Sequence, residues 1–183
     1  PAFVLPLDRD RAIITLVDSN LQRENILPSE RAFAYRMKSE AMKRQGFRTD
    51  LTSSQVVTKL RTDDKVAQGF GVGRMTVQRF IRLTELIPPI LQMVDEGKIA
   101  LTPAVELSFL KKDEQENLFA TMESEEATPS LSQAQRMKSM SQSGRLDMDT
   151  IFAIMTVEKG NQKETLKINT SKLKKYFPKD TTP

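Results

Sequence analysis

Apolar residues recur at the spacing of an α-helix along most of this 183-residue chain, and short polar segments separate the apolar runs. Within residues 74–83, Val77, Phe80 and Ile81 stand at i, i+3 and i+4, which predicts one stripe that packs inward. The same spacing predicts further helices at residues 8–17, 28–45, 54–60, 87–96, 110–122, 130–140 and 150–157, with one more opening at 102–103. The pattern therefore favours an all-α fold.

Several residues mark where these helices are expected to begin and end. Asp8 is a candidate N-cap, and Pro28 suits the first position of a helix. Gly46 and Gly97 are predicted to end helices. The apolar run Phe3–Leu5 predicts one short strand at the start of the chain, for which the sequence shows no partner strand.

Three glycines interrupt the helical spacing between residues 66 and 83. A phosphate-binding loop needs a Lys-Ser or Lys-Thr pair after its glycines, and no such pair follows Gly69, Gly71 and Gly73. A tight turn between two helices is the better interpretation, because glycine adopts a positive φ without steric cost. We expect Gly71 to take that conformation.

The spacing around this turn is typical of a helix-turn-helix at residues 63–83, whose second helix lies in the major groove of DNA. Ala67 provides the small residue where the two helices touch, and Gly71 follows four positions later. Val77 and Phe80 follow as core residues. An ordinary helical hairpin with a solvated basic face is the alternative.

The face of the second helix opposite its apolar stripe is long, donor-rich and cationic, as contact with bases and phosphates requires. The candidate DNA-binding residues on this helix are Arg74, Met75, Thr76, Gln78, Arg79 and Arg82. We expect base contacts from its first turn and a half. Phosphate contacts are expected from basic residues outside that stretch, namely Arg82, Lys43, Arg44 and Arg48.

Composition removes most kinds of chemistry. The chain has neither histidine nor cysteine, which excludes serine–histidine triads, disulfides and nearly all zinc sites. Its acidic residues are scattered, so we expect no catalytic residue and no metal site, and hence no enzyme. A net charge of +4 is compatible with a polyanionic partner.

No apolar run is long enough to span a bilayer, so we expect a soluble, cytoplasmic protein. The methionines Met37, Met93, Met137 and Met155 are expected to fill gaps in the core.

Four motifs follow one another along roughly the first 140 residues. They comprise Asn20, Arg23, Ile26 or Leu27, Pro28 and Glu30; the helix-turn-helix at 67–83; Leu86, Ile87 and Pro88; and Gly97, Lys98, Ile99 and Ala104. This ordered series closely resembles the ParB/RepB family of partition proteins, and the order is far more specific than any single motif.

The resemblance implies a protein that binds double-stranded DNA at a centromere-like inverted repeat during plasmid, mobile-element or chromosome partition. It also implies a ParA-type ATPase as partner and a homodimer in the full-length protein. A helix-turn-helix transcriptional regulator of ParB type, without a segregation role, is the alternative.

The family's amino-terminal domain binds CTP with magnesium, and the resemblance places part of that site at Asn20, Gln22 and Arg23. The family's phosphate-gripping Gly-Glu-Arg-Arg box is expected upstream of Pro1, so CTP and magnesium are expected only in a longer protein. Ser19 departs from the family pattern, which has a glutamate there, and serine is a poorer magnesium anchor. The alternative is that Arg23 and Glu24 merely pair with neighbouring helices.

The expected domain organisation has three segments. Residues 1–27 are the end of a ParB-like amino-terminal domain, residues 28–157 form the helical DNA-binding domain, and residues 158–183 are a linker and a basic tail. The lysines of the tail are candidates for gripping phosphates, and its Tyr176-Phe177-Pro178 stretch is a candidate for docking on a partner.

Overall fold

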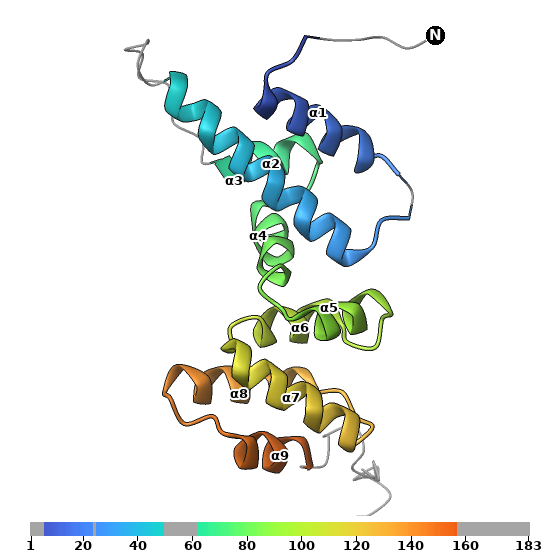
Figure 1. The fold of residues 1–183 in the computed structure, drawn as a ribbon, viewed down its shortest axis with the longest axis vertical. Coiled ribbons are helices and arrows are strands. Elements are labelled where there is room, and N and C mark those ends of the chain that lie inside the picture. The colour runs from blue at the N-terminus through green and yellow to red at the C-terminus, as the bar shows by residue number, and fades with distance from the viewer. Residues whose placement is uncertain (1–5, 24, 50–61, 157–183) are drawn as a thin grey trace, which may run out of the picture.

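The computed structural model describes residues 6–23, 25–49 and 62–156, and these residues form helices joined by short turns, without a strand (Figure 1). The helices are α1 (Arg9–Asn20), α2 (Pro28–Thr49), α3 (Thr62–Gly69), α4 (Arg74–Leu83), α5 (Pro88–Asp95), α6 (Leu101–Leu107), α7 (Lys112–Ser124), α8 (Leu131–Gln142) and α9 (Met148–Thr156). The predicted all-α, helix-turn-helix fold is confirmed. The expected strand at Phe3–Leu5, the helix at 54–60 and the tail lie outside the described residues.

Local signals set the start of the first two helices as expected. The Asp8 carboxylate caps α1 by accepting a hydrogen bond of 2.8 Å from the Arg11 backbone N–H, and Pro28 is the first residue of α2. The prediction that Gly46 ends α2 was wrong, because the helix continues to Thr49. A glycine inside a helix costs only about 1 kcal/mol relative to alanine, which the surrounding turns of helix tolerate.

Three helix ends share one glycine-based turn. Gly71, Gly97 and Gly144 have φ of 63°, 72° and 68°. After α3, the Gly71 N–H donates to Gln68 O and the N–H of the next residue donates to Ala67 O, which is the hydrogen-bond pattern of a Schellman motif. The expected left-handed conformation of Gly71 is confirmed. At the end of α7 the corresponding left-handed position is occupied by Glu126, with φ of 46°.

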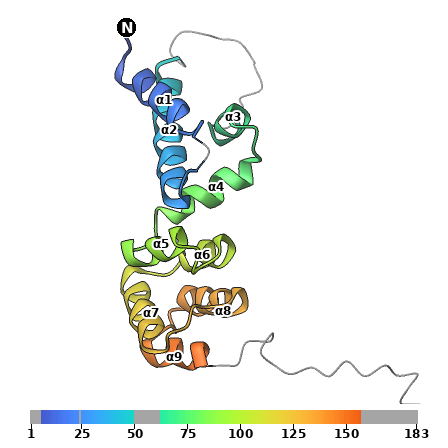
Figure 2. The same cartoon turned by 90° about the vertical axis from the view of Figure 1, so that its right-hand side faces the viewer.

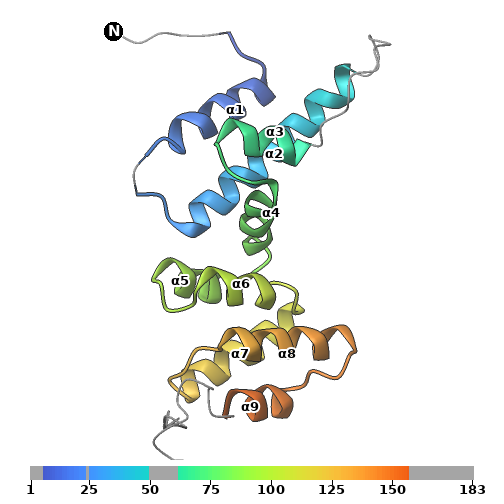
Figure 3. The same cartoon turned by 180° about the vertical axis from the view of Figure 1, so that it is seen from behind.

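The helices form an elongated array in which α1 to α4 lie at one end and α5 to α9 at the other (Figure 1). Both α3 and α4 pack on α2, and α6 packs on α8 (Figure 3). Among the lower helices, α5 and α7 lie on one side of the molecule, and α6 and α8 lie on the other (Figure 2). The lower end of the molecule therefore has two distinct faces.

Aromatic packing holds the helix-turn-helix against α2. Tyr35 of α2 contacts the ring of Phe80 on α4 edge-on, at 5.8 Å between centroids, and the ring of Phe70 in the turn at 5.4 Å. Burial raises the pKa of the Tyr35 phenol, and the nearby Arg31 charge opposes that rise. Lys38, only 6% exposed, lies 4.2 Å from the Phe70 ring and pairs with Asp18 of α1. These contacts join α1 to α4 into one packed group, and the expected boundary after residue 27 stays a prediction.

The buried amide of Gln115 on α7 fastens two turns of the chain together. Its oxygen accepts a hydrogen bond of 2.8 Å from the Ile87 N–H at the start of α5. Its nitrogen donates to the carbonyls of Glu85 and Leu110, at 3.2 and 3.0 Å. The turn between α4 and α5 is therefore tied to the start of α7.

The methionines divide between core and surface. Met137 and Met155 are buried, and Met93 is partly buried against the core, as expected. The prediction for Met37 was wrong, because this side chain on α2 is 42% exposed. Helical spacing alone does not reveal which face of a long helix meets solvent.

Candidate nucleic-acid interface

The second helix of the helix-turn-helix, α4, presents one face to the core and the opposite face outward. Val77 and Leu83 are fully buried, and Phe80 is nearly so. On α3, Val66 and Ala67 are buried against them, as the small residue at position 67 predicted. Since these contacts fix the rotation of α4 about its axis, they decide which side chains point outward.

The first turn of α4 is open to solvent. Met75 is 63% exposed, Thr76 is exposed, and Arg74 lies 3.9 Å from Asp64 in a long ion pair. The N-cap of α4 is Gly73, which offers no side chain to the first N–H groups. An uncapped helix N-terminus attracts anions such as phosphate.

Gln78 lines a cavity of about 320 Å³ formed by residues of α2, α3, α4 and the turn after α4. Its amide nitrogen donates a hydrogen bond of 3.1 Å to Asp63, and Asp63 also accepts from Ser39 at 3.1 Å. The structure therefore uses one amide hydrogen of Gln78 to link the two helices of the motif. The other amide hydrogen and the oxygen have no hydrogen-bond partner among the described residues.

The two outward arginines of α4 reach toward α6. Arg79 donates a hydrogen bond of 2.7 Å to the hydroxyl of Thr102 at the start of α6. Arg82 donates twice to Ser108 at the end of α6, to the hydroxyl at 3.1 Å and to the carbonyl at 2.8 Å. The candidate surface therefore extends from α4 onto α6.

An exposed aromatic ring extends the same surface to α8. The Arg82 guanidinium lies 4.0 Å from the centroid of the Phe109 ring, and the Lys138 ammonium lies 3.8 Å from it. Lys138 also pairs with Glu106 at 2.8 Å. Phe109 and Lys138 could not be predicted as part of this surface, because only the packing of α6 on α8 brings them beside α4. No local pattern marks them.

The basic residues expected to assist from α2 differ in their surroundings. Lys43 is exposed, whereas Arg44 pairs with Asp10 of α1 at 2.9 Å. The side chain of Arg48 lies outside the described residues. Of these three residues, Lys43 is the one whose charged group is both described and exposed without an ion pair.

The candidate nucleotide residues lie away from this surface, at the end of α1. Asn20, Gln22 and Arg23 are exposed, and the Arg23 N–H donates to Asn20 O at 3.3 Å. Their role in binding a nucleotide stays a prediction. Across residues 6–23, 25–49 and 62–156, no group of three or more acidic side chains is placed to hold a metal ion. No described helix is long and apolar enough to cross a membrane.

The fold and the half-buried arginines Arg74, Arg79 and Arg82 of α4 are those of a helix-turn-helix domain of the DNA-binding kind. Comparison with known proteins gives its family: residues 52–137 match the ParB HTH domain. The chain therefore contains a ParB-type helix-turn-helix domain, and the resemblance to the ParB family that its motifs indicated is confirmed.

One curated relative is a probable chromosome 1-partitioning protein ParB of Deinococcus radiodurans, which is 36% identical over 97 residues. The aligned region is 53% of this chain and 27% of the relative, so the chain spans about a quarter of that protein's length. No solved structure matches the chain.

Proposed function

We propose that this chain binds double-stranded DNA sequence-specifically, at a centromere-like inverted repeat, in the partition of a chromosome, plasmid or mobile element. The observation that supports this most is the exposed, donor-rich face of α4 within a region that matches the ParB HTH domain. The name of the Deinococcus relative, a probable chromosome-partitioning protein, agrees with this proposal.

The side chains of α4 divide by role in this proposal. Arg79 reads a guanine by two hydrogen bonds, and Gln78 reads an adenine through the portion of its amide that Asp63 leaves available. The uncapped N-terminus of α4 binds a phosphate beside them. Arg82 and Lys43 neutralise phosphates at the edges of the same surface.

The partners follow from the geometry of such sites. An inverted repeat has two-fold symmetry, and a homodimer matches it by placing one α4 in each half-site. We therefore propose a homodimer in the full-length protein. The likeness to the ParB family supports two further proposals, a ParA-type ATPase as partner and a non-enzymatic role for this chain.

Selection of bound duplexes from a random pool tests the proposal. We expect enrichment of an inverted repeat, with binding that weakens when one half-site is scrambled. Mapping the selected sequence in the host genome then separates partition from gene regulation. Sites grouped beside genes for a partition ATPase support partition, whereas sites confined to promoters support a transcriptional regulator. Failure to enrich any sequence would refute sequence-specific binding.

A further inference from the structure

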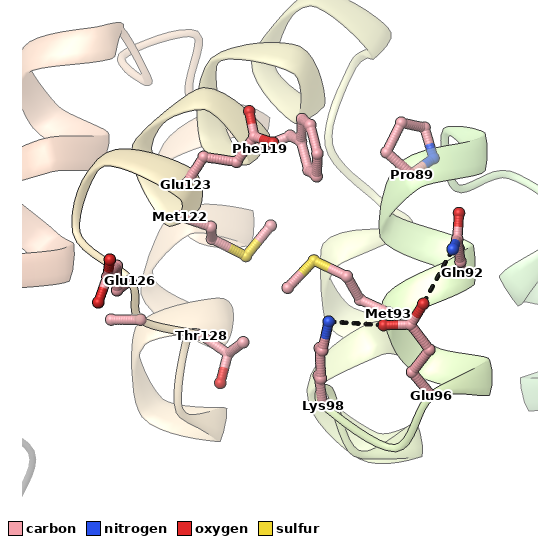
Figure 4. Close-up of a pocket in the computed structure, with 11 residues that line it drawn as sticks. Pro89, Gln92, Met93, Glu96, Lys98, Phe119, Met122, Glu123, Glu126 and Thr128 are labelled. Atoms are coloured by element: carbon pink, nitrogen blue, oxygen red, sulfur yellow. Dashed lines mark hydrogen bonds and ion pairs between the residues drawn. The ribbon is translucent and has the colours of Figure 1, made fainter.

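A groove of about 580 Å³ lies between α5 and the end of α7 (Figure 4). These two helices lie on the side of the molecule opposite α6 and α8 (Figure 2). The thioethers of Met93 and Met122 face each other across it, and the ring of Phe119 lies toward Pro89 (Figure 4). Methionine side chains adapt to irregular apolar partners. The floor of the groove therefore suits apolar side chains from another segment.

The edges of the groove are acidic. Glu96 pairs with Lys98 at 2.7 Å, and Gln92 donates to Glu96 at 2.8 Å. The hydrogen bond from Lys98 is the main cause that lowers the pKa of Glu96, which keeps this carboxylate charged. Glu123 and Glu126 on the opposite edge have no ion pair with any described residue. Such an edge repels phosphates and attracts lysines.

Glu126 itself adopts a backbone conformation that glycine adopts at the ends of α3, α5 and α8. A left-handed φ costs a residue with a Cβ about 1–2 kcal/mol, and glycine at this position would remove that cost. The chain therefore keeps a carboxylate at the edge of the groove although the backbone favours glycine there.

We propose that residues 163–178 of the same chain bind in this groove. They contain five lysines and one glutamate, so their charge is opposite to that of the groove edges. Leu173, Tyr176 and Phe177 stand at i, i+3 and i+4, which makes an apolar face of the kind that an amphipathic helix lays into a groove. Lys172 and Lys174 flank that face and are placed to meet Glu123 and Glu126.

The segment begins only seven residues after the end of α9. α9 ends at Thr156 and packs on α7, which forms one wall of the groove. Residues 157–162 lie between α9 and the binding segment, and six extended residues span up to about 20 Å. A tether this short gives an effective concentration on the order of millimolar, so weak contacts suffice for occupancy.

Methyl NMR of the full chain, labelled with [¹³C-methyl]methionine, tests the proposal. We expect the Met93 and Met122 methyl signals to show nuclear Overhauser contacts to aromatic ring protons of the segment. These contacts should vanish, and both signals should shift, in a Leu173→Ser/Phe177→Ser variant. The Met75 methyl on α4 should not change and serves as the internal control.

Charge reversal gives an independent test. Glu123→Lys/Glu126→Lys should abolish the contacts, whereas Glu125→Lys should keep them, because Glu125 is exposed and does not line the groove. Met93 and Met122 signals that are unchanged in the Leu173→Ser/Phe177→Ser variant would overturn the proposal, even where the charge-reversed chain does not fold. Contacts that weaken on dilution would overturn it too, since they would come from a second copy of the chain.

Discussion

Arg79 and Arg82 lie on the same face of α4, but they differ in how many contacts their guanidinium groups make with the rest of the protein. Arg79 has one hydrogen bond, to a hydroxyl at the edge of α6, and the rest of its guanidinium is available. Arg82 makes two hydrogen bonds to Ser108 and stacks on Phe109, so it also fastens α4 to α6. Substitution of Arg79 and substitution of Arg82 should therefore have different effects on DNA binding and on stability.

Replacing Arg79 by alanine should cost about 1–3 kcal/mol of binding free energy on the cognate duplex and little on a scrambled one, because only base contacts discriminate. Arg82→Ala should weaken binding to both duplexes and reduce the salt slope by about one phosphate. It should also lower the melting temperature, since the contacts with Ser108 are lost. Binding isotherms at two salt concentrations, with melting curves, measure all three effects.

Equal losses on both duplexes for Arg79→Ala would mean that this side chain grips only the backbone. Specificity would then have to come from elsewhere on the surface shared by α4, α6 and α8. Lys138→Ala, at the far end of that surface, is the next variant to measure.

Gly71→Val should lower the melting temperature and abolish DNA binding together. Nothing lies within 4 Å of a Cβ placed at Gly71, so the strain comes from its φ of 63° rather than from a clash. Left-handed backbone costs about 1–2 kcal/mol for a residue with a Cβ, and about 2–4 °C of melting temperature accompanies each kcal/mol in a chain of this size. Gly73→Ser, at a φ of −73°, should melt like the parent.

Among the elements, α7 shows how one buried polar side chain holds a helix in place. Replacing Gln115 by leucine should destabilise the protein by about 2–4 kcal/mol, because a buried N–H and two carbonyls lose their partner. Denaturant unfolding measures this change. Gln135→Leu on α8 is the matched control, since Gln135 is exposed, and it should leave the free energy of unfolding within about 0.5 kcal/mol of the parent.

The sequence predicted those elements whose signals are local. Asp8, Pro28, Gly71 and Gly97 stand where the backbone needs a cap, a fixed φ or a positive φ, and the structure confirms each. Gly46 misled, because a helix continues through a glycine when its neighbours favour the helix. Local signals therefore located most helix ends within two or three residues.

The features that the sequence did not reveal depend on contacts between distant residues. The buried role of Gln115 could not be predicted from a sequence pattern, because it depends on hydrogen bonds with three backbone groups that lie 5 to 30 residues away. Phe109 and Lys138 join the α4 surface only through the packing of α6 on α8. The outward face of α4 was predictable from its period, whereas the extent of the surface around it was not.

At the scale of the whole molecule, one prediction concerns nucleotide binding. We expect the 183-residue chain neither to bind CTP tightly nor to hydrolyse it, because Asn20, Gln22 and Arg23 lie exposed at the end of α1 and no carboxylate stands at Ser19. Phosphate release measured with purified chain, CTP, magnesium and DNA should match the buffer background. Turnover above that background would contradict this expectation.

The two faces of the lower helices separate two kinds of contact. Arg82, Phe109 and Lys138 join α4 to the side on which α6 and α8 lie, and the groove lies between α5 and α7. These two helix pairs lie on opposite sides of the molecule (Figure 2). The proposed occupant of the groove would therefore leave the proposed DNA surface open.

The hydrogen bonds from Arg79 to Thr102 and from Arg82 to Ser108 have a consequence for the entropy of association. A free arginine side chain samples many rotamers, and immobilising such a side chain at an interface costs about 0.5–1.5 kcal/mol. Both guanidinium groups are already held by these hydrogen bonds in the free protein. Much of the loss of side-chain entropy therefore occurs during folding and not during binding. In the proposed DNA complex, α4 would therefore be a preorganised template, and the affinity would depend less on freezing these two long side chains.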